Sequence, residues 1–266
     1  MTVKAIGWRA HAALTASGGR ADVIARLSTS VYAMAAGELI WVGPPGTPLH
    51  PRGVALSAPP VAGAEPSIDV IVASATPWRP PALAALRDGR DVARRLKEAI
   101  GSLGEPRGLA RLALPRAGDD LVTSRARGHA HALAQAAATD DAAAFAVAAH
   151  SLLGLGPGLT PSGDDYVGGA LFARCLVTAT DPAAWKTAAA RIVADAATLT
   201  HPISARLLED LAGGEGWEPL HALALALVDA NREDTVRAAR DLTSLGHTSG
   251  WDMLAGFLIG LRGPAF

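Results

Sequence analysis

Two stretches of the chain combine carboxylates and hydroxyls in the same local order. The first begins at Ser162 and the second at Ser249, 87 positions later. At this offset five residue pairs are identical: Ser162/Ser249, Gly163/Gly250, Asp165/Asp252, Gly169/Gly256 and Leu171/Leu258. Each stretch predicts a polar loop that runs into a helix, where free N–H groups and the positive end of the helix dipole favour an anion. Two such helix starts facing each other would form a binding site.

Three acids stand at these helix starts: Asp164, Asp165 and Asp252. Capping accounts for one acid per helix and leaves the Asp164–Asp165 pair unexplained. The three could orient a substrate amide or hydroxyl by accepting its hydrogens, or they could ligate a hard cation such as Mg²⁺. His247 stands just before the second stretch, and histidine is the side chain best suited to move a proton near neutral pH. We predict catalytic roles for Asp165, Asp252 and His247, and we expect no cofactor, with Mg²⁺ on the three acids as the alternative.

The loop before the first stretch is rich in glycine, which allows positive φ angles and close backbone approach. Its glycines stand at alternate positions: Gly154, Gly156 and Gly158. Thr160 followed by Pro161 fits an N-cap with proline at the first helical position, while Ser162 with Asp165 offers a competing capping arrangement. The sequence does not decide between these two helix starts. The loop is neither a Walker A motif, since no Gly-Lys-Ser/Thr follows, nor a Rossmann fingerprint, since it follows a helix.

The residues predicted to contact substrate come from both stretches and from a third hydroxyl-rich helix start near residue 204. There Arg206, one turn inside the helix, is a candidate anion partner. The predicted substrate-binding residues are Gly156, Gly158, Thr160, Ser162, Gly163, Asp164, Thr248, Ser249, Gly250, Ser204 and Arg206. A purely structural alternative is that two helices pack through small residues, since Gly256 and Gly260 stand one turn apart.

The composition limits the class of protein. Half of the 266 residues are apolar, 18% are charged and the net charge is −1, which is typical of a globular chain. Basic residues are not clustered, which argues against a nucleic-acid surface. The sequence shows no signal peptide and no uncharged apolar run of membrane-spanning length. We therefore expect a cytoplasmic protein without a nucleic-acid or membrane partner.

The pattern of the chain changes near residue 81. Before it, short β-type runs separated by turns predict a hairpin over 31–42 and strands over 53–56 and 68–73. After it, apolar residues at helical spacing predict a series of helices. These cover 83–103, 121–138, 141–153, 183–199, 203–211, 219–230 and 234–245. Strands followed by helices without alternation favour an α+β fold, with a small β-rich part over 1–81 and a mainly helical domain over 82–266 that carries both motifs.

Several motifs also resemble one bacterial family, long described as a domain of unknown function. The matching residues are Gly154–Asp165, Ser204 with Leu207 and Leu208, Gly246–Asp252 and Leu254–Gly256, with Ala75–Pro80 closing the β-rich part. On these residues the chain resembles the AllH-like subunits of oxamate carbamoyltransferase. The resemblance implies a subunit of a heteromeric complex that handles oxamate or oxalurate and carbamoyl phosphate in allantoin (purine) nitrogen catabolism. It also implies FdrA-like and AllG-like partner subunits.

The leading hypothesis is therefore an enzyme subunit whose two helix starts bind a small anion: oxamate, carbamoyl phosphate or phosphate. The Ser-x-Arg-Thr-Arg phosphate motif of aspartate and ornithine carbamoyltransferases is not found here. One alternative is a hydrolase in which Asp164, Asp165 and Asp252 hold a divalent metal that activates water. Another is a non-catalytic assembly or substrate-binding subunit, with the β-rich part as its docking surface.

Overall fold

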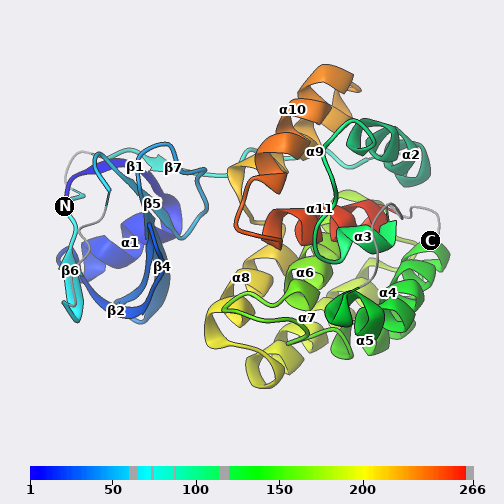
Figure 1. Ribbon diagram of the computed structural model, residues 1–266, viewed down its shortest axis with the longest axis horizontal. Coiled ribbons are helices and arrows are strands. Elements are labelled where there is room, and N and C mark those ends of the chain that lie inside the picture. Colours follow the sequence, from blue (N-terminus) through cyan, green and yellow to red (C-terminus); the bar gives the residue numbers. More distant parts are fainter. Residues whose placement is uncertain (60–64, 73–74, 87, 114–119, 262–266) are drawn as a thin grey trace. The chain divides into compact units, whose positions relative to one another are not determined.

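The chain folds into two compact units (Figure 1). The computed structural model describes residues 1–59, 65–72, 75–86, 88–113 and 120–261. One unit comprises Met1–Pro81 together with Gly216–Glu218, and the other comprises Ala82–Glu215 and Pro219–Phe266. Strands are concentrated in the first unit and helices in the second. The predicted α+β class is confirmed.

The first unit is built on a mixed sheet. Among the described residues its strand order is β6-β2-β3-β4-β5-β1-β7. Neighbouring strands are antiparallel except for the parallel pairs β4–β5 and β1–β7. The bounds are β1 Val3–Gly7, β2 Arg20–Arg26, β3 Val31–Ala35, β4 Glu38–Gly43, β5 Gly53–Leu56, β6 Ser67–Asp69 and β7 Pro77–Trp78.

The predicted hairpin is confirmed as β3 and β4. Its turn residues Ala36 and Gly37 have φ angles of 48° and 81°, as a tight hairpin turn requires. The strand predicted over 53–56 is β5, and the one predicted over 68–73 is the shorter β6. Helix α1 (Trp8–Ala16) lies beside the sheet and contributes Leu14 to a core with Ile6 and Ile40. The sequence analysis did not predict α1, β1 or β2.

The helical unit follows the predicted helices closely. Its helices are α2 Gly89–Ile100, α3 Ala110–Ala113, α4 Leu121–Thr139, α5 Ala142–His150, α6 Ser162–Leu176, α7 Pro182–Leu199, α8 Pro202–Ala212, α9 Glu218–Val228, α10 Arg232–Thr243 and α11 Ser249–Gly260. Figure 1 shows α11, in red, in the middle of this unit with α6 beside it. The described residues contain no helix with the length and apolar character needed to cross a membrane.

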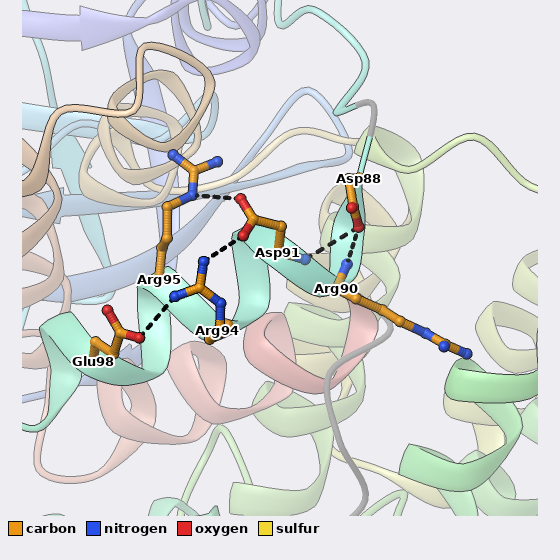
Figure 2. Close-up of polar contacts among 6 residues, drawn as sticks. All are labelled: Asp88, Arg90, Asp91, Arg94, Arg95 and Glu98. Atoms are coloured by element: carbon orange, nitrogen blue, oxygen red, sulfur yellow. Dashed lines mark hydrogen bonds and ion pairs between the residues drawn. The ribbon is translucent and has the colours of Figure 1, made fainter.

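Helix α2 is shorter than predicted because a side chain caps it late. Asp88 accepts hydrogen bonds from the N–H groups of Arg90 and Asp91, at 3.0 and 3.1 Å (Figure 2). The helix predicted to begin at residue 83 therefore begins at Gly89. Along its exposed face Arg94 pairs with Asp91 at 2.5 Å and with Glu98 at 2.9 Å. Such solvent-exposed pairs contribute little to stability.

The turns before α5 and α10 have the same backbone conformation and the same kind of cap. The turn before α5 has the left-handed residue Asp140 (φ 61°), and the turn before α10 has Ala230 (φ 54°) in the position 90 residues later. The next residue, Asp141 or Asn231, caps the following helix by accepting an N–H three positions on. The local backbone geometry of these two turns therefore repeats along the chain.

Candidate functional site

Helices α6 and α11 are in backbone-to-backbone contact, and glycine makes this approach feasible. A Cβ added to Gly169 would lie 2.2 Å from the carbonyl oxygen of Met253, and one added to Gly256 would lie 1.9 Å from that of Tyr166. The two contacts are equivalent, since Gly169/Gly256 and Tyr166/Met253 are both 87 positions apart. The two copies of the motif therefore meet in a locally two-fold arrangement. The sequence analysis considered that two helices pack through small residues. The two helices do pack in this way, and the packing brings their starts together.

The same pair of backbone contacts holds the loop before α6 and the loop before α11. A Cβ on Gly163 would lie 1.9 Å from the carbonyl oxygen of Leu152, and its N–H donates to Leu155 at 2.9 Å. In the second copy Gly250 approaches the carbonyl oxygen of Leu242, with 1.8 Å to a Cβ, and its N–H donates to a carbonyl at 3.1 Å. Gly163 and Gly250 therefore seat the helices and are not free to contact a substrate through their N–H groups. We therefore assign Gly163 and Gly250 a packing role in place of the predicted substrate contact.

Neither of these helices has a side-chain cap. Helix α6 begins after Pro161 and α11 after Thr248, and neither N-cap side chain accepts a bond from its helix. Both capping arrangements considered from the sequence, at Thr160 and at Ser162, are therefore wrong. By contrast α2, α4, α5, α7, α8 and α10 all have an N-cap side chain that accepts a backbone N–H. The hydroxyls and acids of the two motifs are thus available for other partners.

Asp165 and Asp252 are the central carboxyls of the site. Asp165 is 7% exposed and Asp252 is fully buried. Burial raises the pKa of Asp165 well above its ordinary value, and the negative charge of Asp252 raises it further. Burial also raises the pKa of Asp252, to about 7, against the opposing effect of a hydrogen bond from the Leu109 N–H at 2.6 Å. The Oδ2 atom of each carboxyl has no hydrogen-bond partner within the described residues.

Hydroxyl groups surround the two carboxyls and link the two motifs. Thr160 Oγ1 lies 3.2 Å from Ser249 Oγ, and Ser162 Oγ lies 3.4 Å from Thr248 Oγ1. The carboxyls are bonded crosswise, since Ser249 interacts with Asp165 while Ser162 interacts with Asp252. These hydrogen bonds lower the pKa of each carboxyl but do not outweigh burial. Thr160, Thr248 and Ser249 are half-buried and Ser162 is buried, so the hydroxyls lie nearer to solvent than Asp252.

Asp164 has a structural role, which differs from the prediction of a substrate or metal ligand. Its Oδ1 accepts the N–H of Gly154 at 2.7 Å, and its Oδ2 accepts the hydroxyls of Thr200 and, at 2.6 Å, Ser204. Burial raises the pKa of Asp164, although all three donors oppose this. The carboxyl therefore ties the glycine loop to the end of α7 and the start of α8. Ser204, 2% exposed, donates its hydroxyl to Asp164, and its predicted contact with a substrate stays a prediction.

The other two side chains predicted to act at the site lie on the surface. Arg206 is 54% exposed and pairs with Glu209 of its own helix at 3.0 Å, so its predicted role as an anion partner finds no support in the structure. His247 is also exposed, on the loop that leads into α11. It stays a candidate for proton transfer because it precedes Thr248 directly.

A metal centre is not favoured by the arrangement of the acids. The described residues contain no group of three or more His, Cys, Asp or Glu side chains placed to hold a metal ion. Of the three acids, Asp164 is bonded by Gly154, Thr200 and Ser204, whereas Asp165 and Asp252 interact electrostatically. Two carboxyls alone are left at the centre. Mg²⁺ binding by these acids stays a prediction.

The glycines of the first loop adopt the predicted positive φ angles. The φ angles are 72° for Gly154, 125° for Gly156 and 95° for Gly158. A Cβ at Gly156 would lie 2.8 Å from the N atom of Ser162, so this glycine lies against the start of α6. Gly158 is exposed, with no described atom within 4 Å of a Cβ placed on it. Gly158 is therefore the loop glycine with room for a ligand beside it.

Two contributors to the site were missed from the sequence. The Leu109 N–H, just before the short helix α3, reaches Asp252 from 143 residues away, and no sequence pattern could have indicated it. Gly108, at φ 54°, allows this approach, since a Cβ there would lie 2.2 Å from Asp252 Oδ1. The second is Tyr166, which is fully buried and whose pKa is raised by burial and by the charge of Asp252. Its place next to Asp165 in the motif was an available signal.

The fold and the site define a helical unit that places two buried carboxyls in the first turns of two helices without side-chain caps. Residues 152–261 match the family model of the oxamate carbamoyltransferase subunit AllH. The match covers α6 to α11 and confirms the family resemblance over this segment. Over these residues the chain is similar to a subunit of oxamate carbamoyltransferase. No curated protein and no solved structure matches the chain significantly.

Proposed function

We propose that the helical unit binds the small substrate of carbamoyl transfer between the starts of α6 and α11, and that Asp165 and Asp252 handle the proton of the reaction. The observation that carries this proposal is the pairing of these two buried carboxyls, each with a free oxygen, in the first turns of two uncapped helices. The match to the AllH subunit over the same residues supports it.

Carbamoyl transfer requires a group that accepts a proton near neutral pH. In transfer from carbamoyl phosphate to an amide such as oxamate, a C–N bond forms and the C–O bond to phosphate breaks. The attacking nitrogen loses one proton. A general base works best when its pKa lies near the working pH. With a pKa of about 7, Asp252 meets this requirement, whereas a solvent-exposed aspartate would be too weak a base.

The charge of the site also indicates which part of the substrate lies where. Two paired carboxyls repel an anion and attract a hydrogen-bond donor, so the amide end of the substrate is expected at Asp165 and Asp252. The anionic end belongs nearer to solvent, at the helix starts and the hydroxyls of Thr160, Thr248 and Ser249. This arrangement refines the predicted anion site, because one substrate would extend from the N–H groups and hydroxyls of the helix starts to the two carboxyls.

We further propose that the active form is a complex with FdrA-like and AllG-like subunits in allantoin nitrogen catabolism, as the family resemblance implies. The alternative without catalysis, an assembly subunit, has no specific observation in its favour. The buried carboxyl pair would be a costly feature in a protein that only docks.

The test is an assay of the reconstituted complex with oxamate and carbamoyl phosphate. Asp165→Asn and Asp252→Asn each keep the shape of the side chain while removing its acid-base function. We expect each variant to lose at least about 100-fold in turnover, equivalent to ~2.7 kcal/mol of transition-state stabilisation. Glu209→Gln, an exposed acid on α8, serves as the charge-matched control and should retain full turnover. Near-native turnover of both aspartate variants would refute the proposal.

A further inference from the structure

A cavity of about 470 Å³ lies near the C-terminal end of α6, away from the two helix starts. Its walls come from the C-terminal part of α6, the segment that follows, the first half of α7 and the end of α8. Cys175, one of the lining residues, follows Ser162 by 13 positions, which corresponds to about 20 Å along a helix. The cavity is therefore separate from the proposed substrate site.

The lining of the cavity is mainly apolar. Its apolar side chains include Leu171, Val177, Pro182 and Trp185. Small-molecule sites have this character, with a few polar groups among apolar and aromatic ones, and volumes of roughly 300–1,000 Å³. The size and the lining of the cavity therefore fit a molecule with an apolar body.

A buried ion pair fixes one wall of the cavity. The side chain of Arg174 is 3% exposed, pairs with Asp140, and places its guanidinium carbon 3.9 Å from the centroid of the Trp185 ring. Asp140 also accepts the indole N–H of Trp185 at 2.9 Å and the backbone N–H of Thr180 at 2.6 Å. This wall is preformed, which lowers the cost of ordering side chains when a ligand binds.

The charged side chains of the lining are basic. Arg174 and Lys186 line the cavity, and within the described part of the chain no acidic side chain does so. The charge of Arg174 is balanced by Asp140: burial alone would raise the pKa of that carboxyl, but hydrogen bonds and the charge of Arg174 lower it to about 2. Asp181, close to the lining in sequence, is bonded to its own helix as the N-cap of α7. Lys186 is exposed and has no ion-pair partner among the described residues, so its charge is left to attract an anion.

We propose that this cavity binds a small molecule with an apolar body and one carboxylate group, such as a medium-chain aliphatic acid. The apolar body lies against Leu171 and Trp185, and the carboxylate lies at Lys186. Small ions such as acetate or oxamate lack the apolar body and are not expected to bind here. The inference goes beyond the proposed function and does not depend on it, because none of these residues belongs to the site between α6 and α11.

Cys175 allows a direct measurement of occupancy. It is the only cysteine of the chain, and its exposed thiol lines the cavity. The rate of alkylation by iodoacetamide is followed by mass spectrometry of the full chain. Octanoate at about ten times its dissociation constant should slow alkylation about tenfold, because that fraction of the protein is then occupied. Acetate, which lacks the apolar body, and octylamine, which has the opposite charge, should leave the rate unchanged.

Two variants test the two parts of the ligand. Lys186→Ala should weaken octanoate binding about tenfold, the effect of losing one contact to a charged group. Lys97→Ala is the matched control, since Lys97 is an exposed lysine of α2 outside the lining. Ala189→Trp, at a half-buried lining position on α7, should fill the cavity, so that octanoate no longer changes the alkylation rate. The melting temperature of each variant separates loss of binding from loss of folding.

Alkylation of the parent protein that octanoate fails to slow would overturn the proposal. Equal octanoate affinities of Lys186→Ala and Lys97→Ala would overturn the contact between the carboxylate and Lys186. If the partner subunits block Cys175 in the reconstituted complex while octanoate has no effect on the free chain, the cavity is a docking surface and not a ligand site. The proposed function is judged by turnover with oxamate, which none of these results measures.

Discussion

Gly256 of α11 lies directly against the carbonyl oxygen of Tyr166 on α6. A Cβ at Gly256 would stand only 1.9 Å from that oxygen, and 3.1 Å from the backbone nitrogen of Ala170. Backbone atoms cannot move aside as the end of a flexible side chain can. This contact therefore sets the distance between the two helices, and with it the distance between Asp165 and Asp252.

Gly256→Ala should destabilise the protein although alanine is the better helix former. Separating two packed helices should cost about 3 kcal/mol of unfolding free energy, measured by urea denaturation. Gly128→Ala is the control, because Gly128 lies inside α4 with no described atom near a Cβ placed on it. There the helix propensity acts alone, and a gain of up to about 1 kcal/mol is expected. Equal effects of the two substitutions would contradict the packing role of Gly256.

Asp164→Asn should destabilise the protein more than Asp165→Asn. Asp164 accepts three hydrogen bonds, so an amide NH₂ group would face a donor at Thr200 and Ser204 or at Gly154. A loss of about 2–3 kcal/mol is expected for this buried network. At Asp165, where one oxygen has no partner and burial disfavours the charge, asparagine should cost little. Chemical denaturation at pH 7 compares the two. A larger loss at Asp165 would contradict the division of roles between these neighbours.

The stability of the protein should fall as the pH rises from about 4 to 7 because of Asp252. Its pKa is raised from 3.8 to about 7 by burial, so over this range the folded state holds a proton that the unfolded state has lost. Folding is then favoured at low pH, and this advantage disappears as the pH passes 7. The effect is at most a few kcal/mol. Asp165 contributes in the same direction, and the charge of Asp120 adds to the raised pKa of Asp252.

Asp252→Asn should remove much of this pH dependence and leave the stability near pH 4 almost unchanged. Unfolding free energies at several pH values, for the parent and the variant, measure the difference. The same slope in both proteins would show that Asp252 ionises normally and would weaken its assignment as the base.

Arg206→Ala should affect neither stability nor substrate binding. Its guanidinium is exposed and pairs with Glu209 on the surface of α8. Such a pair contributes about 0–1 kcal/mol, and most surface substitutions lie within ~0.5 kcal/mol. Oxamate affinity measured by calorimetry should stay within twofold of the parent value. A large loss would return Arg206 to the site that the sequence analysis assigned to it.

Local features of the sequence were enough to predict most helices and one hairpin. Asp141 and Asn231 precede runs with helical spacing, and both cap helices that begin within about two residues of the predicted starts. Ala36 and Gly37 mark a hairpin turn between two β-type runs. Caps and turns depend on residues a few positions apart, so the sequence alone indicates them. Strands β1 and β2 and helix α1 were missed, because their pairing partners lie elsewhere in the chain.

By itself, the sequence determined that two copies of one motif exist and that Asp165 and Asp252 are equivalent within them. Only the tertiary structure decided what each acid does. Asp164 and Asp165 are neighbours in sequence, but about 100° of helix rotation separates them. One therefore faces α8, where Thr200 and Ser204 satisfy it, and the other faces α11 and Asp252. Which face of a helix is buried against which neighbour depends on contacts between distant segments, and a local pattern does not contain that information.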